Sequence, residues 1–310
     1  MTKVFIDGSA GTTGLRIHER LKERSDLELI ILSDELRKDD SARKEAINSA
    51  DIAFLCLPDA AAIDAVNMIE NKNTAVIDTS TAHRTADGWT YGFAELSAQR
   101  ARIAGSKRVA NPGCHASGFV ALVEPLVKAG IIKSDINLSC FSLTGYSGGG
   151  KKMIAEYEAE NRGALLNAPR LYGLSQQHKH LKEMVKVCGL NSAPVFCPIV
   201  APFYSGMEVS VPLTKSDAKG GMEAVKEIYK EYYKNGLITY VENAEEQGFL
   251  SANALSGRDD MQITVQGNDD RFLLVARFDN LGKGASGAAI QNMNIMLGLN
   301  EATGLVVGGK

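Results

Sequence analysis

The first third of the chain alternates short apolar runs with segments whose apolar residues recur at helical spacing. The runs predict strands at residues 3–7, 27–32, 51–57 and 75–78, and the helical spacing predicts helices at about residues 15–24 and 60–70. Strands that alternate with helices form a parallel sheet wound by crossover connections. This part of the chain is therefore predicted to be an α/β domain.

The pattern changes after residue 133, where long strand-like segments follow one another with few helices between them. These segments cover residues 136–144, 195–202, 208–213 and 261–278. They predict an α+β domain with an antiparallel or mixed sheet. Residues 282–299 return to a helical pattern rich in Gly and Ala, and we expect them to pack on the first domain. The predicted domains are residues 1–113 with 283–310, and residues 114–282.

Composition narrows the class of protein. The chain has 310 residues, a net charge of −3 and a pI near 6.0, which leaves no electrostatic footprint for nucleic acid or a membrane surface. No apolar run is long enough for a transmembrane helix or a signal peptide, so we expect a cytoplasmic protein. The five cysteines show no paired spacing, which argues against a disulfide framework and against a metal site.

A glycine-rich turn lies between the first strand and the first helix. Gly8, Gly11 and Gly14 form a GxxGxxG pattern, in which backbone amides can approach a pyrophosphate at a helix N-terminus. The intervening Ser9, Thr12 and Thr13 are expected to line the same turn. A tight turn with no ligand is the alternative, but its position between strand and helix favours a dinucleotide site.

Two further features bear on that cofactor. Asp34 lies twenty residues beyond Gly14, where an NAD-binding acid sits, whereas Ser33, Arg37 and Lys38 in the same loop could hold a 2′-phosphate. A solvated charged loop is the third possibility. Ligands of open α/β sheets bind beyond the carboxyl ends of the strands. The residues at and just beyond the carboxyl ends of the third and fourth predicted strands are therefore expected to line the edge of the cofactor crevice: Leu57, Pro58, Asp78, Thr79 and Ser80.

Cys114 follows Asn111-Pro-Gly and begins an amphipathic run that ends near Gly130. The run predicts a helix, and free N–H groups with partial positive charge at a helix N-terminus favour thiolate over thiol. A cysteine elsewhere is usually a small packing residue, as we expect for Cys56, Cys140 and Cys197. Cys114 is instead predicted to be a nucleophile.

The chain resembles the N-acetyl-γ-glutamyl-phosphate reductases, in particular their shorter, type 2 form. The resemblance spans nearly the whole chain and rests on these segments: the glycine turn, Asp78-Thr-Ser-Thr-Ala-His-Arg84, Asn111-Pro-Gly-Cys-His115, Ser147-Gly-Gly-Gly-Lys151, His178-Lys-His180 and Asn280-Leu-Gly-Lys-Gly-Ala285. It implies a Rossmann domain completed by the C-terminal helix, NADPH as reductant, a thioester on Cys114, and a role in arginine biosynthesis. A homodimer or homotetramer is expected.

The resemblance also assigns the proton transfer. Reduction through a thioester needs a group that titrates near neutrality, and the histidine segment implies His180 as acid/base, with His178 as the substitute. Glu183 is expected to orient the imidazole or to contact substrate. His115 lies next to the nucleophile, but successive helix residues point in different directions, so a structural role is expected.

The remaining site residues divide between substrate and cofactor. Arg84 is expected to bind phosphate because a guanidinium matches its geometry, and these residues are expected to contact the substrate: Asn111, Ser147, Gly148 and Lys151. The segment with Asn280, Lys283 and Gly284 is expected near the nicotinamide. Longer family members carry an Arg where this chain has Ser205, so the carboxylate contact of that Arg is not carried over to Ser205, and the residue that replaces it stays open.

Two other functions remain open at this stage. One is a related acyl-phosphate reductase, such as aspartate-semialdehyde dehydrogenase, which would share the domain pattern and Cys114. The other is a non-catalytic nucleotide-binding regulator on the same fold, which would need no reactive thiolate.

Overall fold

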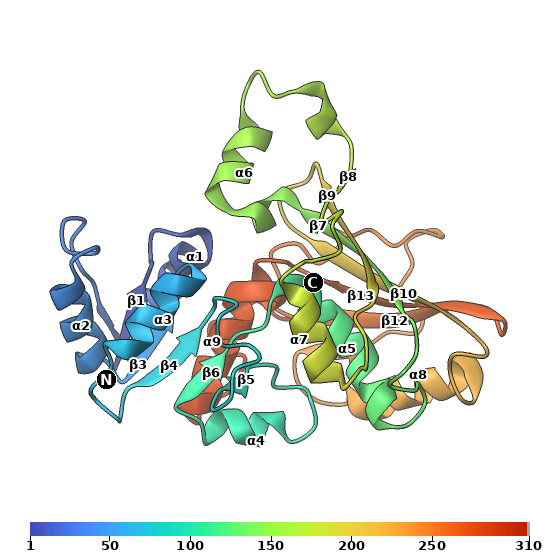
Figure 1. Cartoon of the computed structure of the whole chain (residues 1–310), viewed down its shortest axis with the longest axis horizontal. Helices are drawn as coiled ribbons and strands as arrows, with labels where there is room; N and C mark the ends of the chain where they lie inside the picture. Colours follow the sequence, from blue (N-terminus) through green and yellow to red (C-terminus); the bar gives the residue numbers. More distant parts are fainter. Residues whose placement is uncertain (309–310) are drawn as a thin grey trace. The chain divides into compact units, whose positions relative to one another are not determined.

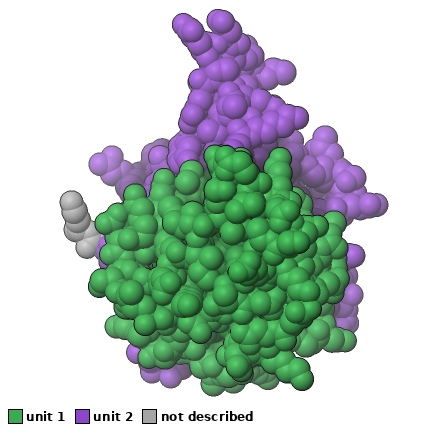
Figure 2. All heavy atoms as spheres, turned by 90° about the vertical axis from the view of Figure 1, so that its left-hand side faces the viewer, with its two compact units in different colours: residues 1–112, 285–305 green, residues 113–284, 306–310 purple. Residues whose placement is uncertain are grey.

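The computed structural model describes residues 1–308, which form two compact units (Figure 2). Unit 1 holds residues 1–112 and 285–305, and unit 2 holds residues 113–284 and the C-terminal residues from Val306. The expected domain ranges differ from these units by one or two residues at the two places where the chain passes between units, and they also differ at the C-terminus, which was expected in the first domain. Residues 309 and 310 lie outside the described residues. Val306 belongs to unit 2 because its backbone N–H donates to Asp259 Oδ2 at 2.8 Å, while its carbonyl accepts from the Asp259 N–H.

Unit 1 is built on a six-stranded sheet in the order β2-β1-β3-β4-β6-β5, and every pair in it is parallel (Figure 1). Its elements, in chain order, are β1 (Thr2–Asp7), α1 (Thr12–Leu21), β2 (Leu27–Ile30), α2 (Asp40–Ser49), β3 (Ile52–Leu55), α3 (Asp59–Asn67), β4 (Ala75–Asp78), β5 (Thr90–Tyr91), α4 (Gln99–Ala104), β6 (Arg108–Ala110) and α9 (Gly287–Met296).

Both faces of this sheet are buried, as the continuous apolar strands require. One core cluster joins alternate strand residues such as Phe54 and Ile77 to Ile17 of α1 and to Ile290 and Met293 of α9. A second cluster joins the intervening strand residues to α2 and α3. The expected α/β domain, completed by the C-terminal helix, is therefore confirmed.

Unit 2 is built on a seven-stranded mixed sheet in the order β11-β12-β13-β10-β7-β9-β8. Its elements are α5 (Cys114–Lys128), β7 (Ser139–Gly145), η1 (Tyr146–Gly149), α6 (Gly150–Glu158), η2 (Ala164–Asn167), β8 (Arg170–Leu171), α7 (His180–Cys188), β9 (Val195–Ala201), β10 (Met207–Thr214), α8 (Gly221–Tyr232), β11 (Ile238–Tyr240), β12 (Met261–Gly267), β13 (Arg271–Phe278) and the π-helix η3 (Gly282–Ser286), which leads into α9. The expected mixed sheet is confirmed. The segment 261–278, expected as one long run, is two antiparallel strands, because polar residues 268–270 form the turn between them.

Helix α5 carries Cys114 at its first position and lies close against the sheet. It packs on β10 and β13, and α7 packs on α5. Gly118 permits this approach, because a Cβ there would lie 2.4 Å from Cγ2 of Val209. Pro125 cannot donate to the Ala121 carbonyl within the helix, and the Tyr233 hydroxyl donates to that carbonyl at 2.6 Å instead. The helix therefore continues through the proline without leaving a buried carbonyl unsatisfied.

An arm formed by α6, η2 and β8 projects from the sheet of unit 2 (Figure 1, light green). It begins with the glycine-rich turn after β7 and returns to the sheet through β8. Among the residues that the structure describes, no helix combines the length and apolar character that crossing a membrane requires.

Candidate active site

The glycine turn after β1 has the close packing that a dinucleotide site needs. A Cβ on Gly8, whose φ is +84°, would lie 2.3 Å from the Cys56 carbonyl oxygen, and one on Gly14 would lie 2.4 Å from the Gly8 carbonyl oxygen. Gly11 caps α1 without a side-chain hydrogen bond, so the start of the helix presents backbone N–H groups. Ser9 lies in the turn before this helix end, and Thr12 and Thr13 are the first residues of α1. These residues fit a bound pyrophosphate. Leu57 and Pro58 follow β3 beside this turn, with Pro58 at the start of α3.

The loop after β2 is exposed and contains both of the competing charge types. Arg37 Nη1 lies 3.0 Å from Asp34 Oδ1, so the basic and the acidic candidate form an ion pair with each other. Ser33 accepts the Arg37 N–H through its carbonyl at 3.0 Å, and Lys38 follows at the surface. The sequence reasoning missed Arg43 of α2, which lies against Asp7 at the end of β1 with Nη2 2.9 Å from Oδ2.

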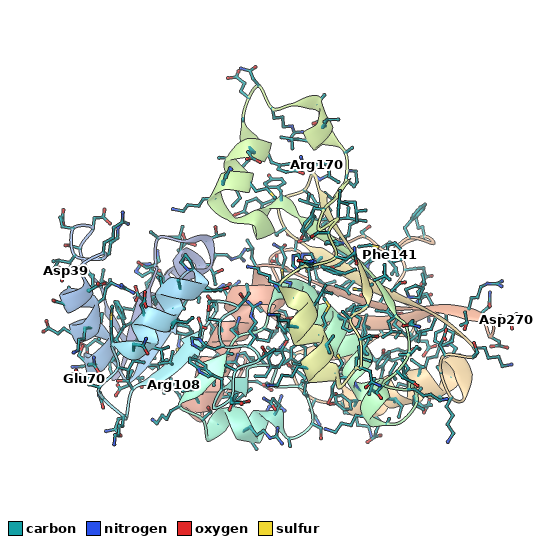
Figure 3. All side chains as sticks on the ribbon, viewed as in Figure 1. Asp39, Glu70, Arg108, Phe141, Arg170 and Asp270 are labelled. Atoms are coloured by element: carbon teal, nitrogen blue, oxygen red, sulfur yellow. The ribbon has the colours of Figure 1, made fainter. Side chains whose placement is uncertain are left out.

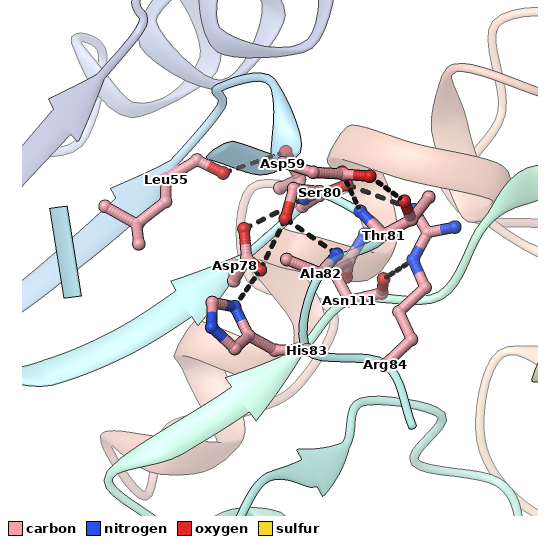
Figure 4. Close-up of polar contacts among 10 residues, drawn as sticks. Leu55, Asp59, Asp78, Ser80, Thr81, Ala82, His83, Arg84 and Asn111 are labelled. Atoms are coloured by element: carbon pink, nitrogen blue, oxygen red, sulfur yellow. Dashed lines mark hydrogen bonds and ion pairs between the residues drawn. The ribbon is translucent and has the colours of Figure 1, made fainter. Parts of the chain in front are cut away.

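The loop after β4 is held by one buried carboxylate (Figure 4). Asp78 Oδ2 lies 2.6 Å from His83 Nδ1 and accepts from the Ser80 hydroxyl at 2.7 Å, and its Oδ1 accepts the Ser80 N–H at 2.9 Å. His83 also stacks on Trp89 with ring centroids 4.1 Å apart. The Ser80 hydroxyl, expected at the cofactor, is therefore engaged in shaping its own loop.

Arg84 and Asn111 are joined at the end of this loop. The Arg84 guanidinium donates through Nε to the Asn111 carbonyl at 2.9 Å and through Nη2 to the Thr79 carbonyl at 3.0 Å. The Asn111 amide donates to the Ala285 carbonyl and accepts from Asn292 of α9. Both ends of the Asn111 amide are thus used within unit 1, where they tie the C-terminal helix to β6.

The N-terminus of α5 places Cys114 where the sequence predicted. Gly113 caps the helix without a side chain, and its N–H donates to Glu183 Oε1 of α7 at 2.9 Å. Gly284 lies directly against Cys114, because a Cβ there would be 3.0 Å from Cys114 Cβ. Glu183 is buried and accepts the Gly113 N–H at the first turn of α5; its expected contact with an imidazole or a substrate stays a prediction.

Three of the other thiols, those of Cys56, Cys140 and Cys188, lie in environments that suppress ionisation. Burial raises the pKa of Cys56 to about 12, and it also raises the pKa values of Cys140 and Cys188. None of the five cysteines, all of which the structure describes, is in a disulfide. The helix N-terminus therefore distinguishes Cys114 from these three packing residues.

Three histidines gather beside α5, although only two were expected to act together. The ring centroids of His178 and His180 are 4.8 Å apart, and that of His115 lies 5.6 Å and 5.5 Å from them. His178 Nδ1 accepts the His180 N–H at 3.3 Å at the start of α7. Burial, and then the charge of Lys179, lower the pKa of His178. The surroundings of His178 therefore favour its neutral form.

The glycine-rich turn after β7 and the segment after β13 contact each other. Asn280 Nδ2 donates to the Ser147 hydroxyl at 3.0 Å, and its Oδ1 accepts the Gly206 N–H at 2.9 Å. Gly148 and Lys151 are exposed, whereas Lys283 is buried at 1% exposure. Ser147 and Asn280 thus position this turn, while the backbone of Gly148 and the ammonium of Lys151 face solvent.

Ser205, at the position of the missing Arg, donates to the buried Asp279 carboxylate at 2.9 Å. Tyr172, directly after β8, was recognised only from the structure, where its ring centroid lies 6.0 Å from that of His178. It has no sequence signal, because it is a lone polar residue outside the motifs.

Two family models match most of the chain. Residues 33–104 match the model described as the semialdehyde dehydrogenase NAD binding domain, and residues 114–280 match the semialdehyde dehydrogenase dimerisation domain. Solved structures share the fold: aspartate semialdehyde dehydrogenase II of Vibrio cholerae, described as complexed with ASA, superposes with a TM-score of 0.72 at 16% identity, covering 96% of this chain and 98% of that one. The aspartate semialdehyde dehydrogenase of Candida albicans, described as with NADP, has a TM-score of 0.68 at 16% identity, covering 96% and 98%.

Curated relatives are more similar in sequence and match over nearly their full length. A protein of Brucella ovis named N-acetyl-gamma-glutamyl-phosphate reductase is 47% identical, covering 96% of this chain and 99% of that protein. Proteins named N-acetyl-gamma-glutamyl-phosphate reductase 2 are 45% identical in Nostoc sp., covering 98% and 99%, and in Pseudomonas putida, covering 97% and 98%.

Proposed function

The chain belongs to the family of N-acetyl-γ-glutamyl-phosphate reductases, and we propose that it reduces N-acetyl-γ-glutamyl phosphate to the semialdehyde with NADPH, in arginine biosynthesis, through a thioester on Cys114. The observation that carries this mechanism is a cysteine at an uncapped helix N-terminus, packed against Gly284 and beside a histidine cluster. That setting favours the thiolate that acyl transfer requires.

The thiolate of Cys114 attacks the acyl carbon, and the bond from that carbon to the phosphate oxygen breaks, which releases phosphate and leaves a thioester. The nicotinamide cofactor supplies the hydride that reduces the thioester. The resulting thiohemiacetal collapses to aldehyde and returns the electron pair to Cys114. A thiolate serves here because it is both a strong nucleophile and a good leaving group.

His180 is proposed to exchange the proton at the thiohemiacetal oxygen. It is buried at 5% exposure at the start of α7, which packs on the helix of Cys114. His178 is proposed to contact substrate oxygen. The lowered pKa of His178 supports this division, because it favours the neutral imidazole, which is the poorer proton donor.

Arg84 is proposed to receive the phosphate. Its guanidinium is oriented by two backbone carbonyls, which is the kind of fixed placement that bidentate phosphate recognition uses. Asn111 acts in this proposal by presenting one of those carbonyls. Gly148 and Lys151 are proposed to contact the acidic groups of the substrate.

NADP is proposed as the cofactor because Arg37 and Lys38 lie after β2, where a 2′-phosphate could meet them. Replacing both with Ala should weaken NADPH binding by roughly 1.5 to 3 kcal/mol for each charge-assisted hydrogen bond that is lost. NADH binding should change little. Dissociation constants measured by fluorescence titration check this, with Lys72→Ala as a control at another exposed lysine.

Asp34→Ala separates the two explanations of cofactor choice. If the basic pair sets the choice, removing Asp34 frees Arg37 from its ion pair and leaves NADPH binding intact or tighter. Equal losses for both cofactors in the Ala pair, or a wild-type preference for NADH, would assign the choice to Asp34.

The substrate is tested by running the reaction in reverse. We expect NADP reduction with phosphate and N-acetylglutamate semialdehyde, and a much lower kcat/KM with aspartate semialdehyde. A higher kcat/KM for aspartate semialdehyde would contradict the proposed substrate.

A homo-oligomer is proposed, assembled through the face of the unit 2 sheet opposite α5 and α8. On that face the side chains of Phe141 (labelled in Figure 3), Val195 and Leu273 are exposed by 48%, 59% and 43%. Register places Phe141 beside Cys197 of β9 and Ser210 of β10, so it lies in the middle of the sheet. Apolar side chains at such a position suit a second copy.

Phe141→Lys should raise the dissociation constant of the assembly by more than about 100-fold, because a buried unpaired charge opposes association. Light scattering coupled to size exclusion measures the change. Ile63→Lys, at an exposed apolar residue of unit 1, is the matched control. A wild-type monomer, or an assembly that Phe141→Lys leaves intact, would contradict this interface.

A cytoplasmic location is also proposed. The support is the biosynthetic role of the family and the five cysteines outside any disulfide, which are usual in a reducing compartment.

A further inference from the structure

The loop that leads from β4 to Arg84 is closed by two contacts between its ends (Figure 4). His83 Nδ1 lies 2.6 Å from Asp78 Oδ2, and Arg84 Nη2 donates to the Thr79 carbonyl at 3.0 Å. The partners are five residues apart in both contacts, so two adjacent residues at one end of the loop bind two adjacent residues at the other. The placement of the Arg84 side chain is therefore tied to that of His83.

The Asp78 carboxylate draws this loop around itself. It is fully buried, and it accepts the Ser80 hydroxyl at 2.7 Å and the Ser80 N–H at 2.9 Å in addition to its contact with His83. A carboxylate offers only acceptors, so the His83 ring donates from Nδ1. A buried charge that loses a donor is costly, and its surroundings shift to supply another. Loss of the His83 donor should therefore move the loop.

The face of the His83 ring is held as well as its edge. The ring stacks on Trp89 with centroids 4.1 Å apart and an interplanar angle of 16°. Trp89 in turn packs against the second core cluster of unit 1. The core of the unit thus fixes the orientation of the imidazole, and the imidazole carries that orientation to the loop.

Other anchors hold the first half of the loop. The Thr79 N–H and hydroxyl both donate to the Leu55 carbonyl, at 2.9 and 3.0 Å, and the Thr81 N–H donates to Asp59 Oδ1 at 2.8 Å. These anchors come before His83 in the chain. His83 is the anchor in the second half, directly beside the guanidinium that the loop presents.

The guanidinium of Arg84 spans the ends of two neighbouring strands. Its second acceptor, at 2.9 Å from Nε, is the carbonyl of Asn111, which follows β6, whereas Thr79 follows β4, and the two strands are parallel neighbours. Ligands of open α/β sheets bind beyond these carboxyl ends. A long side chain that is already ordered there loses less conformational entropy when an anion arrives.

We propose that His83 is a positioning residue for phosphate. Through Asp78 and the loop it holds the Arg84 guanidinium at the carboxyl ends of β4 and β6, and it thereby sets the affinity for phosphate without contacting the anion. The affinities for NADP and for the semialdehyde do not depend on it. The inference rests on the proposed function in taking Arg84 as the phosphate receptor.

The test is the KM for phosphate in the reverse reaction of His83→Phe. Phenylalanine keeps an aromatic ring beside Trp89 but has no donor for Asp78. The KM for phosphate should rise roughly tenfold or more, because a charge-assisted hydrogen bond is lost. The KM values for NADP and N-acetylglutamate semialdehyde should stay within about twofold of wild type, and kcat at saturating phosphate within about threefold. A merely structural defect would not raise one KM selectively.

A conservative variant should restore phosphate binding. The amide N–H of His83→Asn can donate to Asp78 in place of Nδ1, so the KM for phosphate should return to within about threefold of wild type. His18→Phe, at the other histidine of unit 1, is the matched control and should leave all three KM values unchanged.

A double variant tests whether His83 acts through Arg84. Adding His83→Phe to Arg84→Ala should raise the KM for phosphate no further than Arg84→Ala alone. Additive effects would overturn the proposal, because His83 would then act on phosphate by another route.

Two results of the single variants would also overturn the proposal: an unchanged KM for phosphate in His83→Phe, or an equal rise in all three KM values. If His83→Phe fails to fold, Ser80→Ala removes a different donor from the same carboxylate and should raise the KM for phosphate about threefold. An unchanged KM in that variant would count against the proposal in the same way.

Failure of the proposed function gives a different result. An unchanged KM for phosphate in Arg84→Ala would show that Arg84 is not the phosphate receptor. A raised KM in Arg84→Ala together with a normal one in His83→Phe would leave the receptor in place and overturn only the positioning role of His83.

Discussion

Cys114→Ser is expected to lower turnover by more than about 10³-fold while NADPH binding stays within about twofold of the wild type. The serine hydroxyl is far less ionised than the cysteine thiol and is a poorer leaving group. It therefore neither displaces phosphate from the substrate nor leaves readily when the aldehyde forms. Steady-state rates in the reverse direction and NADPH titration measure the two effects. The cofactor result follows because the glycine turn lies in unit 1 and Cys114 in unit 2.

Cys197→Ser is the matched control for this experiment. Cys197 lies on β9 in the same unit and is partly exposed, as Cys114 is. Turnover of Cys197→Ser should remain near the wild-type value. Activity of Cys114→Ser within about tenfold of wild type would show that the acyl group is not carried on this residue.

His180→Ala is expected to lower turnover by about 10² to 10⁴-fold and to remove a near-neutral limb from the pH–rate profile. Acylation of Cys114 should slow less, because a thiolate needs no base in order to attack. A single-turnover measurement of phosphate release separates this step from hydride transfer. The histidine is buried at the start of α7, beside the other two rings.

His178→Ala is expected to be milder and to keep the pH–rate limb. The sign follows from burial and then the charge of Lys179, which lower the pKa of His178, so its protonated form is lost at a lower pH than that of an ordinary histidine. This direction disfavours His178 as the group that holds a proton near pH 7. The reverse order, with His178→Ala severe and His180→Ala nearly normal, would exchange the two assignments.

Local patterns were enough for much of the fold. Strand β4 coincides with the predicted residues 75–78, and α5 begins at Cys114, as predicted from helical spacing. Such elements were predictable because their apolar period matches the face that they bury. The strands β5 and β6 and the helices α2 and α8 were not predicted. The two strands have only two and three residues, and α2 and α8 carry many charged side chains that mask their apolar faces.

The residues of the candidate site were likewise predictable only in part from local sequence patterns. Gly8, Gly14 and Cys114 could be recognised from the sequence, because a glycine turn before a helix and a thiol at a helix N-terminus act through backbone groups a few residues away. The resemblance to a family added Arg84 and the histidine pair. None of this indicated what holds those side chains in place.

Only the tertiary structure decided which polar residues meet. Asp78 with His83, Asn111 with Asn292, and Ser142 with His115 and Tyr172 are contacts between segments that carry no local sign of each other. The sequence by itself determined the longer periodic elements and the place of Cys114 at a helix N-terminus, since both depend on short-range periodicity and helix ends. Hydrogen-bond partners across a sheet depend on strand order and register, which arise when the whole core packs, and so the environment of the thiol was settled at that level.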